Sequence, residues 1–574
     1  MVWSDPTAKE KPANNASAQS PRLEETKSTG TIALIMLSLC IAVFLAALDS
    51  TIITTALPTI AEHFDSPFGY TWIGSAYLLG SAATTQFWGK LSDIFGRKPI
   101  LLVANFVFFI GSLVAALAIN IGMLIVARAI QGVGAGGLLT LVNICIGDIF
   151  SPRSRGTYYG IISAVWALAS AVGPLIGGAF TQNISWRWCF YINLPCDGLA
   201  FIIILVFLNN LHTPQTPLWD GLKAIDWLGS LCITGGTVMF LLGLDFGGVS
   251  FSWDSATVIC LMVFGLSLSV LFLFVQWKLA AYPIIPMRIF SNMHNIGCLL
   301  VSFFHGFVSM GGAYYLPLFF QASRGATPIL SGVYTLATVL SMSFMSVATG
   351  FFIRKTGQYL PPLWFGFILL TLGYGLFIDL RRNSDWAKII LYQIIAGIGV
   401  GPNFQAPQIA LQNNVNPRDI ASATSTFQFI RNIGFTVSVV MGGVVFQNEM
   451  QKQAGWLIAD LGLATTQELT GSSAGASTRV VDALPEPERL IAQDALTHAL
   501  HEMWIIYACF SAAGLLSCAL LHSKSLEKTH EQTRTGLEVE KEKRAEQLRV
   551  DKERKKAKRS AAADGAVPQP NEER

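Results

Sequence analysis

Residues 128–137 read RAIQGVGAGG, and residues 173–178, in the next apolar segment, read GPLIGG. An arginine is costly to hold in hydrocarbon, so an arginine inside an apolar, glycine-rich run normally faces a protein interior or a water-filled cavity and marks a pathway. Arg128 therefore predicts a functional region inside a membrane-embedded helix bundle.

A second copy of this stretch follows at an offset of 265 residues. The offset aligns Gly132 with Gly397, Gly134 with Gly399, Gly136 with Gly401, Pro152-Arg153 with Pro417-Arg418, and Gly177-Gly178 with Gly442-Gly443. Because the offset persists through two apolar segments and their loop, it predicts a duplicated helical bundle. Such duplication is typical of secondary transporters, whose substrate sites lie between the repeats near the middle of the bilayer.

The composition points to a membrane protein. Of 574 residues, 52% are hydrophobic and only 13% are charged, whereas soluble domains carry about 25% charged residues. The net charge of +3 gives no reason to expect a nucleic-acid partner. The nine cysteines all fall in apolar stretches without a close CxxC pair, which is typical of small buried packing residues.

Apolar segments long enough to cross a bilayer, about 20 residues, recur along the chain. Fourteen segments meet this standard, with approximate limits 32–56, 70–88, 99–119, 123–146, 158–181, 189–208, 227–246, 256–277, 295–320, 328–352, 361–379, 387–411, 422–446 and 503–521. The sequence therefore predicts an all-α membrane protein with 14 transmembrane helices.

The offset also divides the chain into domains. We expect a disordered cytosolic tail over 1–30, a first six-helix bundle over 31–208, a linker with two extra transmembrane helices over 209–294, a second six-helix bundle over 295–522 that includes a long outer loop at 447–502, and a charged cytosolic tail over 523–574. The lysine-rich part of that last tail has the composition of a solvated segment or of a helix on anionic lipid.

Basic residues in the short loops indicate the orientation, because lysine and arginine favour the cytoplasmic face. They follow the second, fourth, eighth, tenth and twelfth segments, as Lys90, Arg97, Lys98, Arg153, Arg155, Lys278, Arg288, Arg354, Lys355 and Arg418. Both termini are therefore expected in the cytosol. The plasma membrane is the default location, and the vacuolar membrane is the alternative.

The loop between the second and third segments, residues 89–100, reads GKLSDIFGRKPI. Gly89 and Gly96 permit a close helix approach and a tight turn, and Asp93 can pair with a basic residue such as Arg97 or Lys98 and so latch one conformation. This loop resembles the most diagnostic motif of the major facilitator superfamily. The resemblance implies two six-helix bundles, here with two extra helices.

Other motifs extend the resemblance. The stretch at Arg128 is similar to the superfamily's fourth-helix motif, and Gly173, Pro174, Gly177 and Gly178 look like the fifth-helix motif associated with antiporters. Small residues at near-helical spacing let helices approach closely, and a proline can bend a helix. Packing alone is the alternative explanation for these glycines.

Two further stretches resemble the fourteen-span drug/proton antiporter branch of the superfamily. They are residues 48–58, LDSTIITTALP, and residues 186–195, WRWCFYINLP. The resemblance covers about residues 31–522, and within the branch the chain looks like fungal efflux pumps for toxins and other secondary metabolites, of the aflatoxin-pump type.

This resemblance implies a monomer that exports hydrophobic or amphipathic small molecules, a toxin, drug or secondary metabolite, by alternating access in exchange for protons. Two alternatives stay open: proton-coupled uptake of a siderophore or nutrient by the same fold, and a transport-dead receptor or sensor. The sequence contains no GxxxxGK[ST], HExxH or GxSxG pattern, so ATP-driven transport and hydrolysis are not supported. No enzyme activity, cofactor or metal site is expected.

Asp49 and Arg128 are the expected proton-coupling residues. A carboxyl group partly removed from water can exchange a proton, and an arginine keeps its charge, so Arg128 can sense whether a nearby carboxyl group is ionised. The alternatives are a structural, hydrogen-bonded Asp49 and an Arg128 that locks helices together. Asp197 and Asp245 are further proton candidates, but both fall near the outer ends of their segments, where water can reach them.

Polar residues within the apolar segments are candidates for the substrate cavity. They are Gln131, Asn193, Gln405, Gln408, Gln412 and Arg431. The three glutamines after position 400 are spaced by three and four residues, which places them on one face of a helix. Bonding between helices is the alternative for these amides, and for Arg431 a contact with a neighbouring helix.

Overall fold

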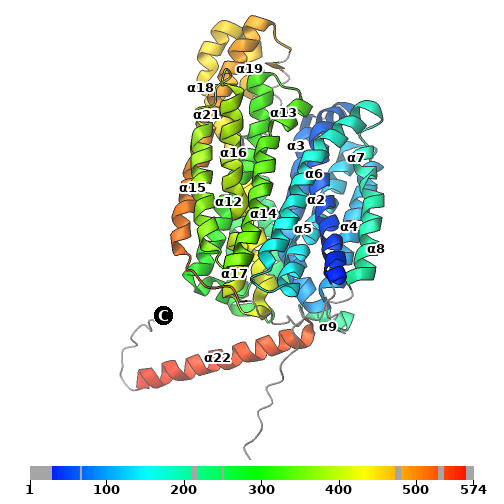
Figure 1. The fold of residues 1–574 in the computed structure, drawn as a ribbon, viewed down its shortest axis with the longest axis vertical. Helices are drawn as coiled ribbons and strands as arrows, with labels where there is room; N and C mark the ends of the chain where they lie inside the picture. The colour runs from blue at the N-terminus through cyan, green and yellow to red at the C-terminus, as the bar shows by residue number, and fades with distance from the viewer. Residues whose placement is uncertain are drawn as a thin grey trace, which may run out of the picture.

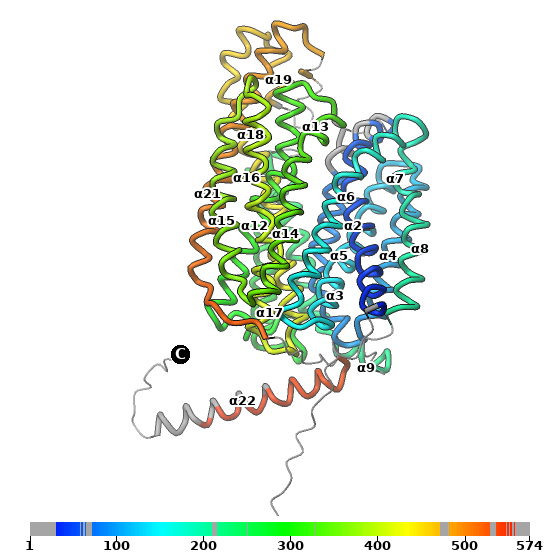
Figure 2. Tube along the Cα trace, in the orientation of Figure 1, coloured from blue at the N-terminus to red at the C-terminus, as the bar shows by residue number. Residues whose placement is uncertain are grey.

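The computed structural model describes residues 29–64, 67–208, 214, 216–248, 251–471, 480–481, 483–527 and 535–563. The predicted N-terminal tail, 1–30, falls almost entirely outside these residues. Figures 1 and 2 show two groups of long helices standing side by side and one charged helix lying across their lower end.

The N bundle holds the first group. Its helices are α2 (Thr29–His63), α3 (Pro67–Phe95), α4 (Arg97–Ala116), α5 (Ile121–Ile149), α6 (Arg155–Asn183), and α7 (Trp188–Tyr191) continued by α8 (Asn193–Phe207). The linker supplies α9 (Leu218–Lys223), α10 (Trp227–Phe246), α11 (Ala256–Phe274) and the short turns η2 (Val275–Leu279) and η3 (Met287–Ser291). Of these, α10 packs on α3, to which Ser75 and Thr234 contribute hydrogen bonds.

The C bundle holds the second group. Its helices are α12 (Met293–Arg324), α13 (Pro328–Tyr334) continued by α14 (Leu336–Thr356), α15 (Leu360–Phe377), α16 (Trp386–Asn403) continued by α17 (Ala406–Asn414), η4 (Pro417–Asp419), α18 (Ile420–Leu461), and α21 (Glu486–Ser517) with η5 (Cys518–Leu520). The short α19 (Leu463–Gly471) lies at one end of the molecule and α22 (Leu537–Ala563) at the other (Figure 1). We call these the α19 end and the α22 end.

Thirteen of the described helices are long and apolar enough to cross a membrane. The remaining predicted segment, 70–88, is present as α3, which has 29 residues and lies within the N bundle against α5. Its polar side chains, among them Thr85, Gln86 and Asp93, are buried by neighbouring helices, so α3 is less apolar than a helix that faces lipid. The expected all-α membrane fold is confirmed, and the chain is a multi-pass membrane protein.

Glycines let α5 touch two neighbours in the N bundle. A Cβ atom added to Gly132 or Gly136 would lie 2.1 or 2.7 Å from a carbonyl oxygen of α3, and one added to Gly134 would lie 2.5 Å from a backbone nitrogen of α4. Because such contacts leave no room for a side chain, the glycines set the distance between the helices.

The C bundle repeats this pattern at the offset of 265 residues. Gly397 and Gly401 of α16 would each place a Cβ atom 2.5 Å from a carbonyl oxygen of α14, and Gly399 would place one 2.3 Å from a backbone nitrogen of α15. The repeat seen in the sequence is therefore a repeat of helix contacts, with the outer two glycines on one neighbour and the middle glycine on the other.

The expected outer loop at 447–502 is mostly helical in its described part, so that expectation was wrong. The helix α18 has 42 residues and runs to Leu461, and α21 begins at Glu486. Buried residues continue along both, for example Met450, Gln453 and Leu457 in α18 and Leu496 and Leu500 in α21. Their three-to-four-residue spacing pairs the two helices beyond the rest of the C bundle (Figure 1). Residues 472–479 and 482 lie outside the described part.

The expected charged tail, 523–574, contains the helix α22, which begins at Leu537. The backbone nitrogen of Gly536 donates to the backbone oxygen of Asp93, and Leu537 packs with Ile94 and Ile225. The tail is therefore bound to the N bundle at this point. Residues 528–534 and 564–574 are not among those described.

Candidate functional site

A buried ion pair lies inside the N bundle. Asp49 of α2 is 0% exposed and Arg128 of α5 is 1% exposed, and Nη1 of Arg128 lies 2.5 Å from Oδ2 of Asp49. The two residues that the sequence singled out for proton coupling, 79 positions apart, are therefore in direct contact.

Neighbouring helices complete the shell around this pair. Nε of Arg128 donates to the backbone oxygen of Ile73 at 3.1 Å, and its guanidinium group lies over the ring of Tyr77 at 4.4 Å. Both partners belong to α3, which approaches closely because Gly132, one turn after Arg128, has no side chain. The glycine-rich sequence of α5 thus brings α3 near enough to accept a hydrogen bond from Arg128 and to place the ring of Tyr77 against its guanidinium group.

Gln131 and Asn193 bind the other carboxylate oxygen. Their amide nitrogens donate to Oδ1 of Asp49 at 3.0 and 2.7 Å, and Gln131 also donates to Ser112 at 2.9 Å and accepts from Arg128 at 3.0 Å. Both side chains are 0% exposed. We expected them to line a substrate cavity, but the helix turns direct them toward Asp49. The group of Asp49, Arg128, Gln131 and Asn193 is named the coupling cluster below.

Hydrogen bonds between the two bundles gather at the α22 end. Arg153 donates to the backbone oxygens of Arg354 and Lys355 at 2.7 and 2.5 Å. The hydroxyl of Tyr159 accepts from Gln408 at 3.2 Å and from Gln412 at 2.9 Å. At the same end, Gly156 of α6 and Gly350 of α14 meet so closely that a Cβ atom on Gly350 would lie 2.2 Å from the oxygen of Gly156. The α22 end of the interface is therefore closed.

A helix break separates the three glutamines that we expected on one face. The helix α16 ends at Asn403 and α17 begins at Ala406, with prolines at 402 and 407. Gln405, at the break, donates to the backbone of Ser346 inside the C bundle, whereas Gln408 and Gln412 reach Tyr159 of the N bundle. The three glutamines therefore do not belong to one continuous helix, and their place in a substrate cavity stays a prediction.

Arg431 lies inside the C bundle beside this break. Its Nη2 donates to the backbone oxygen of Phe404 at 2.7 Å, and its guanidinium group lies over the rings of Phe427 and Phe404 at 4.7 and 5.3 Å. It is 6% exposed. A cation at the carboxyl end of α16 interacts favourably with the helix dipole, so Arg431 stabilises the break.

The loop after α3 forms a second charged group. Arg97 lies 2.8 Å from Asp93 and 2.6 Å from Asp148 of α5, and it donates to Ser92 at 2.6 Å. Gly96 has a φ of 94°, a backbone conformation that glycine adopts readily. The predicted pairing of Asp93 with a basic residue is therefore present, with Arg97, and Asp148 of α5 joins it. The role of this pairing as a conformational latch stays a prediction.

The other predicted latch residues have different positions. Gly89 faces the C bundle, where an added Cβ atom would lie 2.8 Å from the side chain of Ser425 on α18. Lys98 points outward and donates to the backbone oxygen of Leu205 at 2.6 Å. Lys90 pairs with Glu540 of α22. The sequence does not single out this glutamate, because it is one of several in a mixed-charge tail.

The helix α22 connects this loop to both bundles. The ion pair of Glu540 with Lys90 is buried, Lys543 lies 2.5 Å from the same carboxylate, and Arg418 of the C bundle lies 3.1 Å from Glu546. Burial alone would raise the pKa of Glu540, but the charges of Lys90 and Lys543 lower it to about 2. Since this pKa lies below the usual value of 4.5, the pair stabilises docking fully above about pH 5 and is lost only as the pH falls toward about 2.

Glu540→Gln is expected to release α22 from the N bundle. The change leaves the ammonium group of Lys90 buried without a carboxylate, which costs about 1–3 kcal/mol. The lysines and arginines of α22 should then become faster trypsin sites in the purified protein, whereas Glu546→Gln, at a largely exposed pair, should cleave at the wild-type rate. Equal cleavage of Glu540→Gln and wild type would show that the pair does not hold the helix.

The glycines of the fifth-helix motif lie against α2. A Cβ atom on Gly173 would lie 2.2 Å from the hydroxyl of Thr51, and one on Gly177 would lie 2.1 Å from the backbone oxygen of Ile52. A Cβ atom on Gly178 would instead lie 3.2 Å from the side chain of Ile329 on α13. Pro174 lies within α6 without ending the helix. The motif therefore joins α6 both to the helix that carries Asp49 and to the C bundle.

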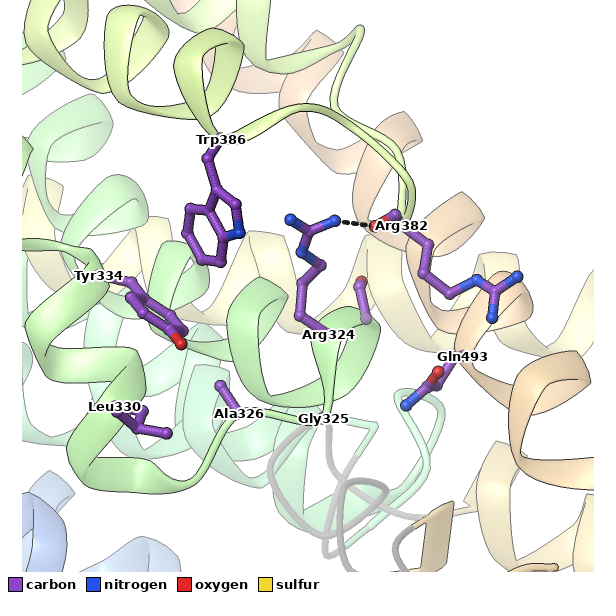
Figure 3. A pocket seen from close by; sticks show the side chains of 9 residues that line it. Arg324, Gly325, Ala326, Leu330, Tyr334, Arg382, Trp386 and Gln493 are labelled. Atoms are coloured by element: carbon purple, nitrogen blue, oxygen red, sulfur yellow. Dashed lines mark hydrogen bonds between the residues drawn. The ribbon is translucent and has the colours of Figure 1, made fainter. Parts of the chain in front are cut away.

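A cavity of about 400 Å³ opens at the α19 end of the C bundle (Figure 3). The guanidinium group of Arg324 lies over the ring of Trp386 at 4.9 Å and donates to the backbone oxygen of Arg382. None of the predicted site residues lines this cavity. In the described part of the chain, no cluster of three histidine, cysteine, aspartate or glutamate residues is arranged to bind a metal ion.

Comparisons with known proteins agree with this architecture. The model of the Major Facilitator Superfamily matches residues 39–439. The chain is 57% identical over 515 residues to efflux pump dotC of Dothistroma septosporum, covering 90% of this chain and 88% of that protein, and 53% identical over 527 residues to MFS-type transporter ppz2 of Metarhizium majus, covering 92% and 91%. Among solved structures, the proton:xylose symporter XylE bound to 6-bromo-6-deoxy-D-glucose has a similar fold, with a TM-score of 0.57, 14% identity, and 88% and 99% coverage.

Proposed function

Because this chain belongs to the Major Facilitator Superfamily, we propose that it exports hydrophobic small molecules in exchange for protons. The chain is a membrane transporter and not an enzyme. The name efflux pump, which dotC carries, favours export over uptake. The repeated glycine contacts of α5 and α16 support two bundles that rock as similar units around a shared substrate site.

The buried pair of Asp49 and Arg128 is the observation that carries proton coupling. Arg128 keeps its charge, so the strength of the pair depends on whether Asp49 is ionised. A proton on Asp49 removes the charge that attracts α5 and weakens the amide bonds from Gln131 and Asn193. The contacts of the coupling cluster that hold α2, α5 and α8 together are then weakened.

Contacts of α6 carry this change to the C bundle. Gly173 and Gly177 fix α6 against α2 within one turn of Asp49, and Gly156 of the same helix meets Gly350 of α14. A shift of α2 therefore moves the helix that closes the α22 end. Protonation of Asp49 is the event that biases the bundles between their two arrangements.

The α22 end is the proposed cytoplasmic side. Basic residues of the short loops lie there: Arg418 pairs with Glu546 of α22, and Arg97 pairs with Asp93, whose backbone oxygen accepts from Gly536. This agrees with the preference of such loops for the cytosol. In this orientation both termini are cytosolic and the interface is closed toward the cytoplasm. We further propose a monomer in the plasma membrane, with neutral or weakly charged, amphipathic cargo.

Cells that overproduce the protein can show whether it exports or takes up its substrate. A panel of neutral, fluorescent hydrophobic dyes is loaded into a host strain, and retained fluorescence is measured with and without a proton uncoupler. Export predicts lower retention of at least one dye, restored by the uncoupler. Higher retention in the overproducing cells would reverse the direction, and lower retention that the uncoupler does not change would contradict proton coupling.

Tyr159→Phe is expected to favour opening at the α22 end. The change removes the hydrogen bonds that Gln408 and Gln412 donate to Tyr159, while their amides keep Asn143 and Thr424 as acceptors. At about 0.5–1.5 kcal/mol for each bond, the loss is about 1–3 kcal/mol. The ratio of closed to open molecules should fall about 5-fold to 100-fold. Distances between spin labels on the α22 ends of α6 and α14 measure this ratio, and an unchanged distance distribution would show that Tyr159 does not hold the closure.

A further inference from the structure

The N bundle contains a second buried carboxyl group, Asp197, which is separate from the ion pair. Asp197 lies on α8 and is 0% exposed, and neither of its carboxyl oxygens has a hydrogen-bond partner. A carboxylate buried without a cation or a donor is very costly. We had expected water to reach Asp197 at the end of its segment, but the helices of the N bundle cover it.

The polar neighbours of Asp197 also present unpaired oxygens. Asn193 lies one turn earlier on the same face of α8, directs its nitrogen to Asp49 at 2.7 Å, and leaves Oδ1 without a partner. Asn105 of α4 directs its nitrogen to the backbone oxygen of Asp197 at 3.1 Å and also leaves Oδ1 without a partner. The region therefore has several acceptor oxygens in need of a donor.

The ionisable groups that face this region do not supply a cation. They are Asp49 of α2 and Cys196 of α8 itself. Beyond them, Cys189 of α7, Tyr77 and Arg128 lie around Asp49. Arg97 and Lys98 of α4 lie at the α22 end, where they bind other groups. The charge of Arg128 is already paired with Asp49, and a second negative charge nearby would be repelled by Asp49.

We propose that Asp197 is a proton-binding site, which in this conformation holds a proton as a neutral acid while Asp49 is ionised against Arg128. The acid O–H donates to an unpaired amide oxygen, either that of Asn193 or that of Asn105. Bulk water supplies the proton when the bundle opens, one O–H bond forms on the carboxylate, and the proton returns to water when that bond breaks. This inference rests on the proposed proton coupling and refines it, because the stored proton and the charge pair belong to different residues.

A proton fits the site better than a metal cation. The site offers one carboxyl group and two amide oxygens, so a single proton neutralises its charge and satisfies an acceptor at once. Asn193 donates to Asp49 and lies next to Asp197 on α8, so it connects the two carboxyl groups. Loss of the proton from Asp197 would place a second negative charge beside Asp49 and favour transfer of a proton to one of the two.

Infrared spectroscopy of the reconstituted full-length protein tests this assignment without substrate. The protein carries 13C-labelled aspartate carboxyl groups, and the C=O stretching band of a protonated carboxylic acid is recorded at neutral pH in H2O and D2O. Wild type should show a labelled band that shifts in D2O, Asp197→Asn should lose this band, and Asp49→Asn should keep it. Asp197→Glu, whose acid is unlabelled, should also lose the labelled band and serves if the asparagine variant does not fold.

Three results would overturn the proposal. They are a wild-type spectrum without the band, a band that disappears in Asp49→Asn but persists in Asp197→Asn, and a band that addition of sodium ions abolishes at constant pH. Because no substrate is present, the spectrum is independent of transport. If the wild-type protein shows no gradient-driven export but keeps the infrared band, the proposed function is refuted and the Asp197 site is not. If the wild-type protein exports with the gradient but shows no band, the site is refuted and Asp49 remains the coupling group.

Discussion

Replacing Asp49 with asparagine is expected to abolish transport driven by a pH gradient and to destabilise the protein. The carboxylate is fully buried and lies 2.5 Å from Nη1 of Arg128, so asparagine leaves a guanidinium charge in the bundle without its counter-ion. Removing one partner of a buried pair costs about 3–5 kcal/mol. Thermal unfolding of the purified variant and gradient-driven flux in vesicles measure the two effects.

A double variant separates coupling from stability. Asp49→Asn combined with Arg128→Met removes both charges and puts an apolar side chain in place of the guanidinium group. Replacing a buried ion pair by well-packed residues of similar volume is often nearly neutral. The double variant should therefore recover most of the lost thermal stability while transport stays independent of the gradient. An Asp49→Asn protein with wild-type flux and wild-type gradient dependence would exclude Asp49 from the mechanism.

Gly177→Ala is expected to separate α6 from α2 and to stop transport. A Cβ atom at this position would lie 2.1 Å from the backbone oxygen of Ile52 and 2.6 Å from the hydroxyl of Thr55. Backbone cannot move aside as a flexible side chain does, so the two helices must separate, at a cost of about 1–3 kcal/mol. Ile52 lies one turn after Asp49, and a displacement of about 1 Å at a functional group can lower a rate about 100-fold.

A glycine in an open position provides the matched control. A Cβ atom on Gly375 of α15 would meet no atom within 4 Å, so Gly375→Ala should stabilise the helix by about 0.5–1 kcal/mol and leave transport unchanged. Initial transport rates and unfolding temperatures of the two alanine variants are compared under the same conditions. Equal behaviour of both variants would show that the contact of α6 with α2 does not limit the transport cycle.

The number and order of the helices follow from the sequence because the membrane imposes a length and an apolar composition on each span. The repeat of the two bundles could also be predicted from the sequence. Glycines where two backbones touch cannot be replaced without separating the helices, so the same glycine pattern stands in both bundles. The directions in which polar side chains point could not be predicted from the sequence. Gln131 and Asn193 were expected in a cavity and lie on Asp49 instead, because hydropathy locates a helix but does not fix its rotation about its own axis.

Three long-range contacts cannot be read from the local sequence. The extensions of α18 and α21 bury residues such as Met450 and Leu496 within otherwise polar sequence, so a count of apolar residues reads them as a loop. Glu540 is one of several glutamates in a basic tail, and only the position of Lys90 in the folded N bundle distinguishes it. The pairing of Asp49 with Arg128 joins two motifs whose contact no local pattern specifies.

Proton movement during export is the most direct test of the account. The protein is reconstituted with its α22 end outward in sealed vesicles that contain a pH indicator and have no initial pH gradient. A fluorescent substrate, one that the overproducing cells export, is then added outside. The account predicts that the interior becomes more alkaline as substrate enters, since protons leave in exchange, and that Asp49→Asn shows no such change. Substrate entry without a change in internal pH, or with acidification, would contradict proton antiport.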